Sequence, residues 1–139
     1  MTAIRQIMTP GCECIGEQQT LLDAAKKMRE LDVGALPICG TDGVLKGMLT
    51  DRDIVVRALA DSKDPRGIPA GELATGTPLY VEADARVEEV LAAMARHQVR
   101  RMPVIENGQL VGIVAQADIA RHREEHEAGQ LVGAVSRDE

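Results

Sequence analysis

The sequence predicts an α/β (α+β) fold in which two β-α-β-β-α repeats pack as a pseudo-two-fold pair. The first observation behind this prediction is an internal duplication, because residues 28–38 recur 66 positions later and residues 43–53 recur 65 positions later. The matched pairs are Met28 and Met94, Val33 and Val99, Pro37 and Pro103, Ile38 and Val104, Gly43 and Gly108, Gly47 and Gly112, and Asp53 and Asp118. The second observation is that both copies show the same order of strand and helix patterns. A fixed period indicates that each unit buries an apolar face against its neighbour, so we expect the functional site in the cleft between the copies.

Each copy opens with a short extended segment, residues 12–16 and 79–82, and a helix follows it. The helices are expected over 21–31 and 87–97, where apolar residues recur at helical spacing and predict a buried stripe. Thr20 is the expected N-cap of the first helix, with Asp23 as its capping-box partner. The stripe residues are Leu21, Leu22, Ala25 and Met28 in the first copy and Val87, Val90, Leu91 and Met94 in the second.

A hairpin and a second helix complete each copy. The turns carry Asp42-Gly43 and Asn107-Gly108, dipeptides that favour tight hairpin turns because they accept positive φ. A second helix is expected to start near Asp51 and Gln116. The expected strands are residues 35–38 and 44–50 in the first copy and 102–105 and 109–115 in the second.

The expected organisation is a first repeat over residues 8–60 and a second over 72–125. Residues 61–71 between them are rich in Pro, Gly and charge, which is typical of a linker. Residues 126–139 form a mostly polar C-terminal tail. Its apolar residues, Leu131, Val132 and Val135, predict one amphipathic turn that packs against a partner chain.

The composition excludes several classes of function. A net charge of -6, with one Tyr and no Phe or Trp, argues against nucleic-acid binding. No apolar run approaches the roughly 20 residues that span a bilayer, and the first residues lack the apolar core of a signal peptide. Three cysteines, an odd number, suit a reducing compartment. We therefore expect a cytoplasmic protein with no nucleic-acid or membrane partner.

The repeat resembles the CBS domain, and two copies in tandem resemble a CBS pair, or Bateman module. The resemblance rests on an apolar-Pro-apolar strand, on a Gly-apolar-apolar-Thr strand end with an Asp three residues later, and on the opening Ile7-Met8-Thr9-Pro10. It covers residues 4 to 125 and implies a stand-alone regulatory or sensor protein, not an enzyme. Such a protein would bind an AMP- or ATP-type adenosyl ligand, form a homodimer and signal to an unknown effector in a stress or energy response. The absence of a nucleophile motif or phosphate-binding Gly-rich loop also argues against catalysis.

The segment from Gly47 to Asp53 could hold that ligand. A strand ends at Thr50 and a helix starts after it, so unpaired backbone N–H groups and the Thr50 hydroxyl suit a phosphate. The Asp53 carboxylate can accept two hydrogen bonds from a ribose diol, and Arg52 can supply a counter-charge. By the resemblance, Thr50 and Asp53 hold phosphate and ribose, and the apolar wall around the base consists of Ala35, Leu36 and Pro37. The alternative is that Thr50 and Asp53 only cap the helix.

The second copy keeps the carboxylate, Asp118, but has Ala115 in place of the hydroxyl. Losing one hydrogen bond to a charged group costs about 1.5–3 kcal/mol, or roughly tenfold to a hundredfold in affinity. Arg100 and Arg101 stand where the first copy has Gly and Ala, and they either replace the lost donor or fill the cleft. We expect a weak or vacant second site, and the alternative is that both clefts are empty.

The histidines offer a metal site as a second hypothesis. His97 closes the first helix of the second copy, and His122 lies one turn beyond Asp118 in the next helix, so the two imidazoles can meet. Zinc binds imidazole and usually takes four ligands, with His126, Glu125 or a dimer mate supplying the rest. The alternative is that these histidines only place favourable charge near a helix C-terminus.

The cysteines allow a redox interpretation. Cys12 and Cys14 form a C-x-C pair, and a Cys14–Cys39 disulfide is conceivable if their strands are neighbours. In a cytosolic protein such a bond is expected to be redox-responsive. The alternative is two small buried apolar residues, a common use of Cys. The second hypothesis as a whole is therefore a zinc-binding or redox-responsive stress protein with vacant clefts.

Overall fold

The computed structural model describes residues 2–11, 13–74 and 78–138, with side chains described as far as residue 128. Repeat 1 contains β2 (Ile15–Gly16), α1 (Leu21–Leu31), β3 (Ala35–Cys39), β4 (Leu45–Thr50) and α2 (Asp51–Arg57). Repeat 2 contains β5 (Val81–Glu82), α3 (Val87–His97), β6 (Arg101–Glu106), β7 (Gln109–Ala115) and α4 (Gln116–Asp138). Strand β1 (Thr9–Pro10) and the short 3-10 turns η1 (Ile4–Gln6), η2 (Leu59–Asp61), η3 (Pro65–Gly67) and η4 (Ala70–Leu73) complete the described elements.

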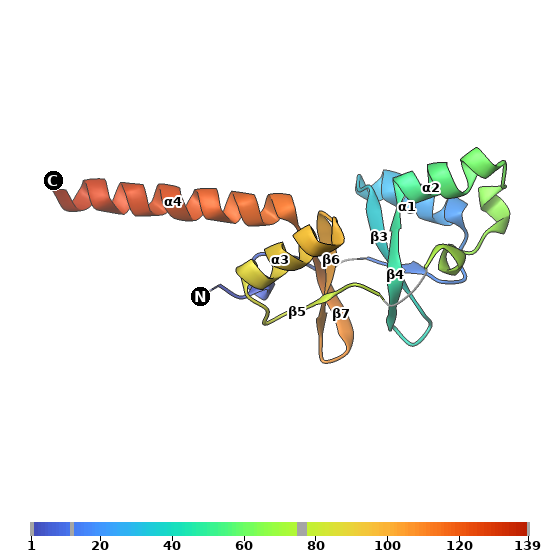
Figure 1. Ribbon diagram of the computed structural model, residues 1–139, viewed down its shortest axis with the longest axis horizontal. Coiled ribbons are helices and arrows are strands. Elements are labelled where there is room, and N and C mark those ends of the chain that lie inside the picture. Colours follow the sequence, from blue (N-terminus) through green and yellow to red (C-terminus); the bar gives the residue numbers. More distant parts are fainter. Residues whose placement is uncertain (1, 12, 75–77, 139) are drawn as a thin grey trace.

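The strands form two sheets, one for each repeat. In repeat 1, β2 runs parallel to β3, and β3 pairs antiparallel with β4. In repeat 2, β5 runs parallel to β6, and β6 pairs antiparallel with β7. Figure 1 shows the hairpins β3–β4 and β6–β7 side by side in the middle of the molecule, with the helices of each repeat on its outer side. The predicted pair of mixed α/β repeats is confirmed.

The repeats exchange their N-terminal arms. The N–H groups of Ile4 and Arg5 donate to the carbonyls of Ala85 and Ala83 in repeat 2, at 2.8 and 3.0 Å, and β1 extends the repeat 2 sheet beside β7. The equivalent arm of repeat 2 returns to repeat 1 in the same way. There, Ala70 N–H donates to Gln19 O at 2.7 Å, and Gly71 N–H donates to Glu17 O at 2.9 Å. The segment expected to be a linker is therefore partly built into the fold of repeat 1.

Each repeat has its own aliphatic core. The repeat 1 core includes Ile15, Leu21, Ile38 and Leu49, and the repeat 2 core includes its counterparts together with Ile4 from the exchanged arm. The helical stripe differs in one detail from the prediction, because Ala24 is fully buried in repeat 1. Leu22 and Ala25 are only partly buried. Each core also contains residues from the arm of the other repeat, so the two cores depend on one another structurally.

The local signals at helix and hairpin ends are confirmed. Thr20 Oγ1 accepts from Asp23 N–H at 3.1 Å, and Asp23 Oδ2 accepts from Thr20 N–H at 3.1 Å, which is the capping box expected at the start of α1. In the second hairpin turn, Asn107 and Gly108 have φ of 53° and 77°. These are the positive values that the Asn-Gly sequence accommodates.

Helix α4 continues without a break from Gln116 to Asp138, through the region expected to be a separate tail. Figure 1 shows its C-terminal part extending away from both sheets. The side chains of Leu131, Val132 and Val135 lie outside the described residues, so the turn predicted there has no structural account. Among the described helices, none has both the length and the apolar character that crossing a membrane requires.

The predicted Cys14–Cys39 disulfide is not present. The two residues are not bonded to each other, Cys39 being buried and Cys14 half-buried. The register explains why, since Cys39 lies opposite Gly16 rather than Cys14 in the parallel pair of β2 and β3. A displacement of two residues along a strand and one strand spacing across separates Cα atoms by roughly 8 Å, beyond the reach of a disulfide. Cys12, the other member of the C-x-C pair, lies outside the described residues.

Candidate functional site

A cavity of about 920 Å³ lies between the repeats and is lined by both of them. Repeat 1 contributes the start of β3, the end of β4 and the first turns of α2. Repeat 2 contributes the end of α3 and the start of β6, and the arm between the repeats closes a further side. The lining residues include Ala35, Met48, Thr50, Asp51, Arg52, Asp53, Arg57, Leu73, Ala74, Leu79, Val99, Arg100, Arg101 and Pro103.

Thr50 and Asp53 meet at the mouth of α2 in a second capping box. Thr50 Oγ1 accepts from Asp53 N–H at 3.0 Å, and Asp53 Oδ2 accepts from Thr50 N–H at 3.0 Å. The alternative that Thr50 and Asp53 cap the helix is therefore confirmed. Both residues also line the cavity. The described residues place no partner on Asp53 Oδ1, so one carboxylate oxygen remains available to a ligand hydroxyl.

The apolar wall is built differently from the expectation. Ala35 lines the cavity, but Leu36 is 2% exposed and packs in the repeat 1 core, because successive strand residues point to opposite faces. Pro37 is buried and does not line the cavity, whereas its counterpart in repeat 2, Pro103, does. The apolar lining that the sequence analysis missed is Met48, Leu73, Ala74, Leu79, Val99 and Pro103.

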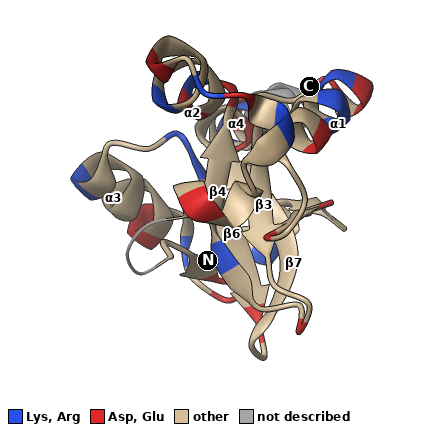
Figure 2. Ribbon diagram, turned by 90° about the vertical axis from the view of Figure 1, so that its right-hand side faces the viewer, with Lys and Arg blue, Asp and Glu red and all other residues tan. Residues whose placement is uncertain are grey.

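Four arginines line the same cavity. Arg52 and Arg57 come from α2, and Arg57 Nη1 donates to Leu73 O at 3.0 Å, which fixes its guanidinium against the arm. Arg100 and Arg101, which the sequence analysis assigned to the second cleft, come from the start of β6. Arg57 was missed altogether, although its spacing of four from Asp53 puts both on one helix face. Figure 2 shows acidic and basic segments interspersed over the ribbon, so a cavity with this many arginines differs from the general pattern.

The equivalent position in repeat 2 is occupied by internal contacts. Asp118 Oδ2 accepts from Ala115 N–H at 2.9 Å, and its Oδ1 accepts from Arg121 Nη2 at 2.7 Å. Asp118 does not line the 920 Å³ cavity. Nearby, a Cβ added to Gly112 would lie 2.7 Å from Met8 Sδ, so the Met8 side chain fills space against β7. Both carboxylate oxygens of Asp118 are therefore already used.

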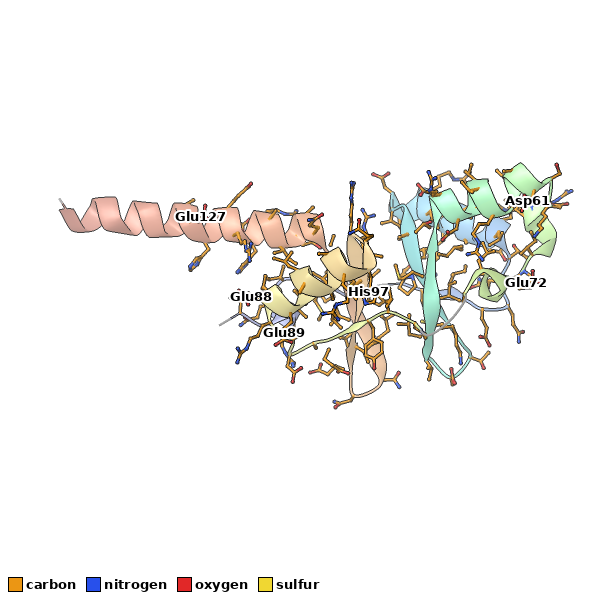
Figure 3. All side chains as sticks on the ribbon, in the orientation of Figure 1. Asp61, Glu72, Glu88, Glu89, His97 and Glu127 are labelled. Carbon is orange, nitrogen blue, oxygen red and sulfur yellow. The ribbon has the colours of Figure 1, made fainter. Side chains whose placement is uncertain are left out.

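The histidines lie on neighbouring helices of repeat 2. His97 is exposed at the C-terminal end of α3, and His122 is half-buried in α4, which packs against α3. Figure 3 shows His97 at the end of α3 that is nearer the middle of the molecule. Across the described ranges, no group of three or more His, Cys, Asp and Glu side chains gathers closely enough to hold a metal ion. The described residues of one chain thus offer at most part of a zinc ligand set.

Two stretches of the sequence, residues 4–59 and 70–125, match the family model of the CBS domain. Both begin at the exchanged arms, so the family unit includes the segments that cross between repeats.

Individual proteins are similar over nearly the full chain. Hypoxic response protein 1 of Mycobacterium tuberculosis is 56% identical over 135 residues, which are 97% of this chain and 94% of that protein. The protein YlbB of Bacillus subtilis is 39% identical over 138 residues, covering 98% of this chain and 93% of its own. The crystal structure of Hypoxic Response Protein I with two coordinated zinc ions superposes with a TM-score of 0.83 at 57% identity, over 87% of this chain and 98% of that one.

Proposed function

The chain belongs to the CBS-domain family, and on this premise we propose that it is a regulatory module that binds an adenine nucleotide or related adenosyl ligand between its repeats. The observation that carries the proposal is the cavity in which the start of α2, an apolar wall and four arginines face one another. We propose no catalytic step, because the site's polar groups bind and orient a ligand without an attacking nucleophile. The name of the mycobacterial relative supports a role in a stress response, exerted through an effector protein.

The ligand is proposed to lie with its phosphate at the start of α2. The first N–H groups of α2 already donate within the chain, those of Asp51, Arg52 and Asp53 to Gly34 O, Asp51 Oδ1 and Thr50 Oγ1, so the phosphate is assigned to the Arg52 guanidinium, which adds a full positive charge there. The ribose diol is assigned to Asp53 Oδ1. The base is assigned to the aliphatic wall around Ala35, Met48 and Val99, where burial of apolar surface rather than aromatic stacking supplies the affinity.

Isothermal titration with AMP, ATP and S-adenosylmethionine tests this proposal. We expect Asp53→Ala to weaken binding of whichever ligand binds by about tenfold to a hundredfold, because it removes hydrogen bonds to a charged acceptor. The matched control is Asp23→Ala, which removes the same capping box from α1 at a position outside the cavity. Equal affinities for wild type and Asp53→Ala, or no binding of any adenosyl compound, would overturn the proposal.

Zinc binding is a second candidate function, favoured by the two zinc ions in the 57% identical structure. His97 and His122 would supply imidazole nitrogens to the ion, which acts there as a structural cross-link. Because the described part of one chain gathers too few ligands, we propose that a second copy completes the tetrahedral set. Metal analysis of the purified protein should then find zinc that is lost in His122→Ala together with the oligomer. The His126→Ala variant, altered one turn further along α4, should retain both the zinc and the oligomer.

A homodimer is proposed on the outer face of repeat 1. Val55, Val56 and Leu59 on α2 are 54%, 46% and 52% exposed, although they are apolar. The corresponding residues of α4 are Ala120, Arg121 and Glu124, so repeat 2 lacks this apolar surface. Light scattering coupled to size exclusion should detect a dimer that Val55→Asp dissociates and the matched Ala120→Asp does not. A monomeric wild type would contradict the proposal.

A further inference from the structure

The cavity between the repeats concentrates positive charge in an acidic chain. Its four arginines face two carboxylates, those of Asp51 and Asp53. The whole chain, by contrast, has 16 Lys and Arg against 22 Asp and Glu. Positive charge is thus locally in excess inside a concave space that is also lined by apolar groups. Such a space has a low dielectric constant, which strengthens the electrostatic attraction on an anion that enters it. This cavity is therefore suited to an anion with more charge than one phosphate.

The arginine charges are not neutralised within the protein. Arg52, Arg100 and Arg101 are exposed, and none of them takes part in an ion pair of the described residues. The two carboxylates are engaged locally, since Asp53 Oδ2 accepts from Thr50 N–H and Asp51 Oδ1 accepts from Arg52 N–H at 2.8 Å. The guanidinium groups are thus available to a ligand, and each can donate two parallel hydrogen bonds to a phosphate.

The four arginines come from both repeats, so a ligand that contacts all of them must span the cleft. Arg52 and Arg57 stand on the helix that holds the first phosphate in the proposed binding mode. Arg100 and Arg101 stand on the facing repeat, at the start of β6, where repeat 1 has Gly34 and Ala35. A single phosphate bound by the repeat 1 arginines leaves the repeat 2 pair without a partner. Further phosphates in a chain would supply that partner.

Resting on the proposed function, we propose that the ligand is a nucleoside di- or triphosphate and that Arg100 and Arg101 are its specificity-determining residues. They bind the terminal phosphates across the cleft, so the ligand ties repeat 2 to repeat 1. The cationic sulfonium of S-adenosylmethionine is disfavoured by the same charges. Because exposed charge pairs are weakened by solvent, each arginine is expected to contribute about tenfold in affinity, at the lower end of the range for charged hydrogen bonds.

The test titrates adenosine, AMP, ADP, ATP and inorganic tripolyphosphate into wild type and into an Arg100→Gln/Arg101→Gln variant. The matched control is Arg86→Gln/Arg96→Gln, which removes the same charge from exposed arginines of repeat 2 that do not line the cavity. We expect affinity to rise from adenosine through AMP to ATP in wild type and in the control. In the cavity variant ATP binding should weaken about a hundredfold, whereas binding of adenosine, which carries no phosphate, should weaken much less. Raising ionic strength should weaken ATP more than adenosine.

Other outcomes separate this inference from the function on which it rests. Equal binding of adenosine and ATP, or an ATP preference that survives in the cavity variant, would overturn the role of Arg100 and Arg101 and leave the adenosyl site standing. Tripolyphosphate binding that depends on these arginines, without any nucleoside binding, would support the anion site and overturn the adenosyl ligand. Failure of every compound to bind would overturn both.

Discussion

The two repeats share a framework but differ in chemistry at the start of their second helices. In repeat 1, Thr50 and Asp53 cap α2 and line the cavity, and Asp53 Oδ1 has no partner among the described residues. In repeat 2, Ala115 has no hydroxyl, and Asp118 gives its second oxygen to Arg121. At this equivalent position the structure describes a partner for one Asp53 oxygen in repeat 1 and for both Asp118 oxygens in repeat 2.

The exchanged arms reinforce this difference. Repeat 2's arm brings Ala74 against β4, where a Cβ on Gly47 would lie 3.1 Å from the Ala74 Cβ. Repeat 1's arm brings the larger Met8 to the equivalent place against Gly112. The arms therefore place a methyl group against β4 in repeat 1 and a longer thioether side chain against β7 in repeat 2.

The largest effect is expected from transplanting repeat 1 residues into repeat 2. The variant Met8→Ala/Ala115→Thr/Arg121→Val installs the residues found at positions 74, 50 and 56. Met8→Ala shortens the side chain next to Gly112, Ala115→Thr adds the hydroxyl, and Arg121→Val removes the partner of Asp118 Oδ1. Titration with ATP should find one site per chain in wild type and a second, weaker site in the variant.

The control for this transplant is Asp118→Ala. In the wild-type background it should leave ATP binding unchanged, because Asp118 does not line the 920 Å³ cavity. In the transplanted background it should remove the second binding event alone. A wild-type protein that already binds two nucleotides per chain would contradict the comparison between the clefts.

Local sequence signals predicted the elements well, because helix and hairpin ends are decided by nearby residues. Thr20 and Asp23 cap α1 as their spacing requires, and the helix bounds 21–31 and 87–97 agree with the structure. The position of Arg100 and Arg101 was not predictable in this way. Aligning the repeats assigned them to the second cleft, but the strand starts of both repeats face one cavity in the folded pair. The prediction that Leu36 lines the cavity was also wrong, because its side chain is buried in the repeat 1 core. The apolar run 35–38 does not indicate which of its residues face the core and which face the cavity.

A smaller effect, on stability, is expected from adding one methyl group at equivalent glycines. In Gly112→Ala the new Cβ would lie 2.6 Å from Thr9 O, a backbone atom of the β1–β7 pair that cannot retreat without breaking the sheet edge. In Gly47→Ala the nearest atoms would be Ala74 Cβ at 3.1 Å and Ala74 Cα at 3.4 Å, a milder contact. We expect Gly112→Ala to lower the free energy of unfolding by about 1–3 kcal/mol and Gly47→Ala by less. Urea unfolding of both variants measures the difference, and an equal loss would mean that the arms pack alike.

The smallest effect concerns the helix caps themselves. Thr50→Ala should cost about 1 kcal/mol of stability, because the N–H of Asp53 loses its acceptor, and Thr20→Ala should cost the same at α1. Ala115→Thr should instead gain up to about 1 kcal/mol, since Asp118 already provides the other half of a capping box. Denaturant midpoints measured without ligand test all three. If Ala115→Thr stabilises the protein, folding stability does not explain why repeat 2 has Ala rather than Thr at this position, and a difference in ligand binding becomes the explanation to test. If Ala115→Thr destabilises the protein, the surroundings of residue 115 do not accommodate a hydroxyl, and the two repeats differ here in packing.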